Sequence, residues 1–270
     1  MKKEYSKTID FSNHKIGLYD IDTFSKDWDN AKTNKGEIPK GISGGRGRIA
    51  KIGNKKVLQL TIPKNSLSDG GFFWRLKLPK DSEDVIFEYD IMFGNNFNFV
   101  RGGKLPGLAG GTAPGGGSKD KNGFSARLMW RAAISYEELC HLVKDPKLAG
   151  KKDIHKPYLV QYTYYPDKRS RKWGKDQVYE HNNKKIFIRP NKWYNIKMHM
   201  KLAKDPTKKD TILAWVNDNR VLYKRLNLRK SKAYGIDQVQ FSLFFGGNDP
   251  SWATKKKEKI YFRRFAIKGK

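Results

Sequence analysis

The chain consists largely of short runs of β-branched and aromatic residues, which often alternate with polar residues and end at Gly, Asn, Asp or Pro. This pattern is typical of β-strands separated by turns. In the run over 193–202, Tyr194, Ile196 and Met198 are apolar, whereas the residues between them are polar. A strand of this kind has one buried and one solvated face. The runs cover residues 56–62, 71–78, 84–93, 123–131, 158–165, 185–188, 193–202, 211–216, 220–226, 237–245 and 259–267.

These runs predict an all-β fold with two packed antiparallel sheets. The segment Asn217-Asp218-Asn219 separates two of them and predicts a hairpin turn, because Asn and Asp tolerate left-handed backbone angles. One helix is predicted, over 135–144, with a serine at its start and a proline beyond its end. We expect this helix to be a short insertion between two strands.

The sequence has 270 residues and contains no segment typical of a linker between domains. A Gly-rich stretch over 102–117 has the composition of a linker, but it lies between two predicted strands. We therefore interpret it as an ordered loop beside a site. A single domain is predicted, in which residues 1–55 form an N-terminal extension with the first strands and residues 56–270 form the main body.

Positive charge dominates the composition, with 56 Lys and Arg against 27 Asp and Glu, a formal net charge of +29. Such a chain attracts polyanions, whether nucleic acids, anionic lipid surfaces or acidic polysaccharides. The two lysines near the N-terminus precede no apolar run, and no later stretch approaches about 18 apolar residues. We expect neither a signal peptide nor a transmembrane segment, and the compartment stays open.

Several kinds of chemistry lack their motifs. The only cysteine is Cys140, within the predicted helix, so an intrachain disulfide and a four-thiolate zinc site are excluded. The chain has no P-loop, HExxH, EF-hand or GxSxG motif. We therefore predict no metal and no cofactor.

Basic residues gather around the Gly-rich stretch, where the only acid is Asp120. In the run over 123–131, a period of two places Arg127 and Arg131 on one strand face. The same period aligns Tyr162 with Tyr164 in the run over 158–165. Taken separately, such rows are usually solvated faces or packing pairs. The basic residues between 101 and 131 are Arg101, Lys104, Lys119, Lys121, Arg127 and Arg131.

Together these residues suit proton removal from C5 of a uronic acid within a polysaccharide. The reaction adds charge to a sugar that is already anionic, so a cation must neutralise its carboxylate. Arginine offers a planar bidentate fork for this purpose and lysine a compact charge. A nearby tyrosine can act as a base when ionised or as an acid toward the leaving oxygen when protonated.

Three segments carry a resemblance to a known family: RGGKLPGLAGG over 101–111, GFSARLMWR over 123–131 and YTYYP over 162–166. They resemble polysaccharide lyase family 14, the alginate lyases of chlorella viruses and marine molluscs, which are related to glucuronan lyases. The resemblance covers about residues 70–267. The stretch over 132–157 is longer than expected for that family.

The resemblance implies a concanavalin-like β-jelly roll with a cationic cleft across its concave sheet, and β-elimination of a polyuronate such as alginate or glucuronan. One origin that it implies is a virus, whose encoded protein would act on the cell wall of the host. We expect a monomer whose partner is the acidic polysaccharide. Its implied catalytic residues are Lys104, Ser125, Arg127, Tyr162 and Tyr164, with Arg75 and Arg131 as candidates for flanking sugar subsites.

Two other functions remain open at this level. A non-catalytic, lectin-like module for acidic polysaccharides would keep Lys104 and Arg127 but would not need the hydroxyl groups of the two tyrosines. A nucleic-acid binder would also combine positive charge with aromatic residues. The sequence contains no RNP-like, helix-turn-helix or zinc motif, so no specific nucleic-acid partner is expected.

Overall fold

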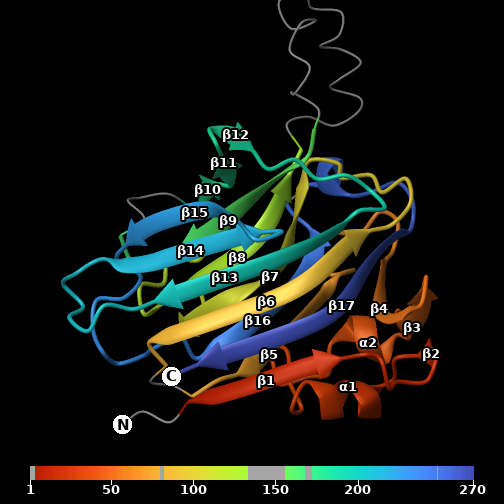
Figure 1. Ribbon diagram of the computed structural model, residues 1–270, viewed down its shortest axis with the longest axis horizontal. Coiled ribbons are helices and arrows are strands. Elements are labelled where there is room, and N and C mark those ends of the chain that lie inside the picture. Colours follow the sequence, from red (N-terminus) through yellow and green to blue (C-terminus); the bar gives the residue numbers. More distant parts are fainter. Residues whose placement is uncertain (1–3, 80–81, 133–155, 168–171, 248) are drawn as a thin grey trace, which may run out of the picture.

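The computed structural model describes residues 4–79, 82–132, 156–167, 172–247 and 249–270. Its two large antiparallel sheets lie face to face (Figure 1). The six-stranded sheet has the order β10-β9-β8-β7-β16-β5, and the larger sheet has the path β15-β14-β13-β6-β17-β4-β3-β2 with β1 paired to β17. The all-β, two-sheet fold predicted from the sequence is confirmed.

The strands of the six-stranded sheet are β5 (Phe72–Lys77), β7 (Gly102–Gly111), β8 (Gly123–Arg131), β9 (Tyr158–Tyr164), β10 (Lys175–Val178) and β16 (Gln238–Phe245). Those of the larger sheet are β1 (Tyr5–Asp10), β2 (Gly17–Leu18), β3 (Gly47–Ile52), β4 (Lys55–Ile62), β6 (Asp84–Phe93), β13 (Trp193–Lys201), β14 (Asp210–Val216), β15 (Asn219–Leu226) and β17 (Glu258–Gly269). A small pair is formed by β11 (Glu180–His181) and β12 (Lys184–Lys185).

The core lies between the two sheets and is rich in aromatic rings. Trp74 of β5 stacks on Phe241 of β16 with ring centres 3.6 Å apart. Phe241 also contacts Phe262 and Phe265 of β17 in the opposite sheet, at 5.6 and 5.9 Å. Burial of such rings supplies much of the free energy that holds two sheets together.

The Gly-rich stretch differs from its prediction as a loop, because residues 102–111 form strand β7 within the six-stranded sheet. Its glycines permit close packing, since a methyl group at Gly103 would overlap the Trp130 ring of β8. Only the remainder of the stretch is irregular, and Gly116 and Gly117 there have left-handed φ angles of 60° and 84°. Glycine adopts such angles without steric cost.

The helices also differ from the prediction. The predicted helix over 135–144 lies outside the described residues. Two helices that were not predicted, α1 (Ile21–Asp27) and α2 (Lys40–Ser43), lie in the N-terminal region, and a 3₁₀ turn η1 covers Pro250–Trp252. The Asp20 side chain caps α1 by accepting from the Thr23 amide at 2.8 Å. This cap is the local sequence feature from which α1 could be predicted.

The strand predictions were otherwise accurate to within a few residues, except over 185–188. There the strand β12 ends at Lys185, and Phe187 forms an isolated bridge with Tyr158. The predicted turn at Asn217 and Asp218 is confirmed, with φ angles of 49° and 64°. Among the described residues, no helix has the length and apolar character needed to cross a membrane.

Candidate active site

A row of residues crosses the six-stranded sheet from edge to edge on the face turned away from the core. The strand register pairs Arg75 with Gln240, Gln240 with Gly107, Gly107 with Arg127, Arg127 with Tyr162 and Tyr162 with Asp176. Residues paired in this way lie side by side on one sheet face. The row thus brings together residues from all six strands of the sheet, from Arg75 to Gln240 in the sequence.

Arg127 and Ser125 lie on β8 under the loop that follows β7. The alternation predicted for this strand is confirmed, but both side chains are almost fully buried, with 4% and 0% of their surface exposed. The Ser125 hydroxyl donates to the Pro114 carbonyl of the loop at 2.6 Å. Two guanidinium nitrogens of Arg127, Nε and Nη2, are buried without a hydrogen-bond partner. Such groups are rare in proteins unless a ligand or water completes them.

The two tyrosines predicted on β9 lie against each other. Their hydroxyl oxygens are 3.4 Å apart, and their rings meet edge to face with centres 5.5 Å apart. The Gly174 amide donates to the Tyr162 hydroxyl at 3.0 Å and the Gly117 amide donates to the Tyr164 hydroxyl at 3.1 Å. Burial raises the pKa of Tyr162, and its contact with Tyr164 raises it further. Tyr162 is therefore protonated at neutral pH.

Lys104 on β7 completes this cluster. Its Nζ lies 3.4 Å from the centre of the Tyr162 ring and 2.8 Å from the Met129 Sδ. Burial lowers the pKa of Lys104 well below its usual value, and the charges of Arg127 and Arg131 lower it further. A buried amine that readily loses its proton is suited to accept one from a substrate.

The two residues predicted to flank the site differ in their surroundings. Arg131 is engaged by Asp176, and its guanidinium lies 5.5 Å from the Tyr162 ring centre. Arg75 lies at the other end of the row, 5.8 Å from the Phe73 ring centre, where its charge acts on Arg127. The structure thus places Arg131 beside the tyrosines and Arg75 on the far side of Gly107.

Three residues of the cluster were given no role from the sequence. Met129 had been placed on the same strand face as Arg127, but its contact with Lys104 depends on the pairing of β7 with β8. Asp176 lies on β10, which was not predicted as a strand, and Gln240 lies on the predicted run over 237–245 but outside any motif, so no local signal identified them. Across the described part of the chain, no three His, Cys, Asp or Glu side chains are grouped as metal ligands.

Comparison with known proteins identifies the family of this chain. The sequence profile of the family described as Polysaccharide lyase 14 matches residues 50–265. The chain belongs to polysaccharide lyase family 14. The predictions of this family and of a lyase are confirmed. A search among curated proteins finds no match.

Solved structures of alginate lyases share the jelly-roll fold of this family 14 lyase. Aly36B superimposes with a TM-score of 0.78 at 21% identity, covering 97% of this chain and 96% of that one. The lyase from Aplysia kurodai has a TM-score of 0.69 at 22% identity, with 96% and 97% covered. The Chlorella virus lyase vAL-1 has a TM-score of 0.63 at 22% identity, with 83% and 89% covered. A variant of Aly36B has been crystallised with an alginate tetrasaccharide.

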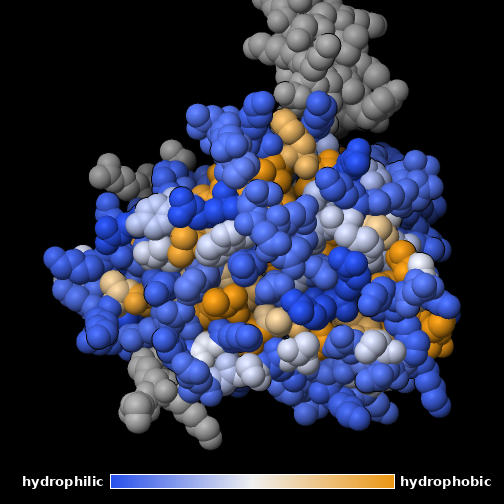
Figure 2. All heavy atoms as spheres, viewed as in Figure 1, coloured by the Kyte–Doolittle hydropathy of each residue, from blue (hydrophilic) through white to orange (hydrophobic). Residues whose placement is uncertain are grey.

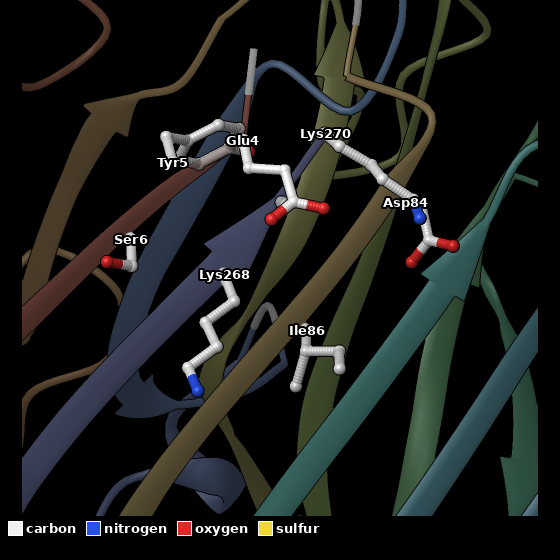
Figure 3. A pocket seen from close by; sticks show the side chains of 8 residues that line it. Glu4, Tyr5, Ser6, Asp84, Ile86, Lys268 and Lys270 are labelled. Atoms are coloured by element: carbon white, nitrogen blue, oxygen red, sulfur yellow. The ribbon is translucent and has the colours of Figure 1, made fainter. Parts of the chain in front are cut away.

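A separate hollow of about 450 Å³ in this lyase lies where the chain ends meet the larger sheet (Figure 3). Lys268, Lys270, Asp84 and Glu4 surround it. The Asp84 carboxylate is already engaged by His199 at 2.6 Å and by Lys201 at 3.4 Å. The hollow therefore belongs to the junction of the chain ends and not to the cluster on the six-stranded sheet.

Proposed function

We propose that this lyase cleaves an acidic polyuronate, alginate or glucuronan, by β-elimination that leaves a 4,5-unsaturated uronate at the new non-reducing end. The observation that carries this proposal is the contact of the buried Lys104 amine with Tyr162 beside Arg127, whose guanidinium has unpaired nitrogens. An amine, a phenol and a fixed cation are the three groups that such an elimination needs.

Arg127 neutralises the carboxylate of the sugar that loses its proton. Its charge persists because the guanidinium stays protonated even where burial lowers its pKa. The Ser125 hydrogen is already directed at Pro114, so we assign Ser125 to holding the covering loop and not to donating to the substrate.

Lys104 acts as the base and Tyr162 as the acid. The neutral Lys104 amine takes the C5 proton, the C4–O bond breaks as the C4–C5 double bond forms, and the Tyr162 phenol gives its proton to the leaving oxygen. The opposite pKa directions of the two groups favour this assignment over a tyrosine base. Tyr164 supports Tyr162 through their hydroxyl contact.

Arg75 is proposed to bind a neighbouring uronate, because it lies in the same row as Arg127 and its Nε is buried without a partner. Arg131 is less suited to that role, since Asp176 occupies two of its guanidinium nitrogens.

We also propose that the whole chain acts as one domain. The N-terminal strand β1 pairs with β17 near the C-terminus, from Tyr5 opposite Gly269 to Asp10 opposite Arg264. The strand β3 pairs with β4 in the same sheet. Removal of residues 1–55 would therefore expose the edges of two strands.

The test is incubation of the purified protein with alginate and with polyglucuronate, following the ultraviolet absorbance of the unsaturated product and the sizes of the products. We expect product from at least one polymer, and its absence from both contradicts the proposal. Tyr162→Phe distinguishes a lyase from a lectin-like module. In both, the variant should still bind the polymer. Only in a lyase should the change abolish the formation of product.

A further inference from the structure

The guanidinium of Arg131 is held in a bidentate ion pair by Asp176. Its Nε donates to Asp176 Oδ2 at 2.9 Å and its Nη2 donates to Oδ1 at 3.0 Å. Arg131 lies on β8 and Asp176 on β10, so the pair bridges the intervening strand β9, which carries Tyr162. Paired nitrogen and oxygen contacts of this kind fix the orientation of the guanidinium plane.

The orientation of Arg131 matters because its guanidinium lies against the Tyr162 ring. The distance from Cζ to the ring centre is 5.5 Å, and a second ring, Trp252, lies 5.9 Å from the same carbon. Lys104 Nζ also contacts the Tyr162 ring, at 3.4 Å from its centre. The ring of the proposed acid is thus in contact with the Lys104 amine and with a guanidinium that an aspartate holds in place.

The charges around the Lys104 amine come from two strands. Arg127 and Arg131 on β8 contribute positive charge and Asp176 on β10 contributes negative charge, whereas the protonated Tyr162 phenol on β9 is neutral. The β16 residue opposite Lys104 is Phe244, which is uncharged. Among the described residues, Asp176 is thus the carboxylate that offsets the two arginines at Lys104.

We propose that Asp176 and Arg131 are positioning residues that together hold the Tyr162 ring against Lys104 and balance the positive charge around the Lys104 amine. This inference rests on the proposed function, in which Lys104 is the base. Without Asp176, the positive charge of Arg131 is not offset, so the Lys104 amine releases its proton more readily. Loss of Arg131 has the opposite effect, because it removes a repelling cation.

The test is the pH dependence of kcat/KM for Asp176→Asn, Arg131→Met and the double variant. The acidic limb reports protonation of the base. We expect Asp176→Asn to move this limb to lower pH by roughly half a unit or more, Arg131→Met to move it to higher pH, and the double variant to lie between them. Each single change should also lower kcat about tenfold, because the ring is no longer held.

Asp29→Asn makes the same change of charge at an exposed ion pair with Lys7 and should leave the profile unchanged. Asp176→Glu keeps the negative charge, so its acidic limb should stay near that of the wild type while kcat falls. This variant tests the positioning role if Asp176→Asn does not fold.

Acidic limbs that do not move, or that move in the same direction in both single variants, would overturn the inference and leave Asp176 with a structural role. A wild-type protein that forms no unsaturated product would instead contradict the proposed function. In that case NMR titration of carbon-labelled lysine still tests the effect of Asp176 on Lys104, because it requires no activity. Opposite shifts of the Lys104 titration in the two single variants would support the charge balance.

Discussion

The outward faces of the two sheets both carry charged side chains but place them in different surroundings. On the larger sheet, Glu88 accepts from Arg264 at 2.6 Å and both side chains are partly exposed, at 25% and 45%. On the six-stranded sheet, Lys104 and Arg127 are 8% and 4% exposed. The molecular surface seen in Figure 2 is mostly hydrophilic, as expected for charges that remain in water.

This difference separates charges that remain in contact with water from charges that can act on a substrate. Exposed ion pairs contribute little to stability because water screens them. Buried cations are costly unless something balances them, so they persist where they serve a site. A variant of each kind should therefore affect the protein differently.

The largest effect is expected for Lys104→Met. The change removes the proposed base, so kcat should fall by roughly 100- to 10,000-fold, measured from the unsaturated product. Lys197→Met is the matched control on the larger sheet, where Lys197 packs on Trp215 at 4.9 Å. A Lys104→Met enzyme as active as the control would contradict the role of Lys104.

Tyr162→Phe should lower kcat by about 100-fold with little change in KM, because the proton for the leaving oxygen is lost while the ring remains. Steady-state kinetics on the preferred polymer measures both quantities. Tyr223→Phe, at a side chain that is 59% exposed on β15, should behave as the wild type. A rise in KM alone would assign Tyr162 to binding.

The buried amine also predicts how stability depends on pH. Burial lowers the pKa of Lys104 below its ordinary value of 10.5, so between the two pKa values the unfolded chain binds more protons than the folded one. The free energy of unfolding should therefore fall as the pH is lowered through that interval, by about 1.4 kcal/mol for each pH unit. Denaturant titrations at several pH values give the free energy of unfolding against pH, and the wild type should show this slope where Lys104→Met does not. If the two proteins show the same slope, the amine is not buried.

Gly103→Ala tests the packing of the glycine strand. The added methyl group would overlap the Trp130 ring, and overpacking of this kind costs about 1–3 kcal/mol. Thermal or denaturant unfolding measures the loss. An unchanged stability would mean that β7 and β8 separate more easily than the structure indicates.

The smallest effect is expected for Glu88→Gln on the larger sheet. The partly exposed pair with Arg264 should contribute less than about 1 kcal/mol, and added salt should reduce even that difference. Product formation should stay at the wild-type rate, since this residue lies on the other sheet. A loss of activity here would show that the two outward faces do not act separately.

Much of the fold could be predicted from the sequence, because alternation is a local property. The predicted run over 84–93 coincides with β6, and that over 123–131 coincides with β8. Strand β7 could not be predicted in this way, because its glycines have no side chains from which a period can be read. These glycines leave room for an aromatic ring on the neighbouring strand, and that packing is a tertiary contact.

For the candidate site, the sequence by itself determined the residue types, the strand faces and the resemblance to the lyases. Only the tertiary structure decided that Lys104 meets Tyr162, that Ser125 is bound to Pro114 and that Arg131 is bound to Asp176. The reason is physical: the pKa of an amine or a phenol depends on burial and on neighbouring charges, and those neighbours come from strands up to 72 residues away in the chain, the separation of Lys104 and Asp176. Local periodicity places a side chain on a face, whereas strand pairing determines what it touches.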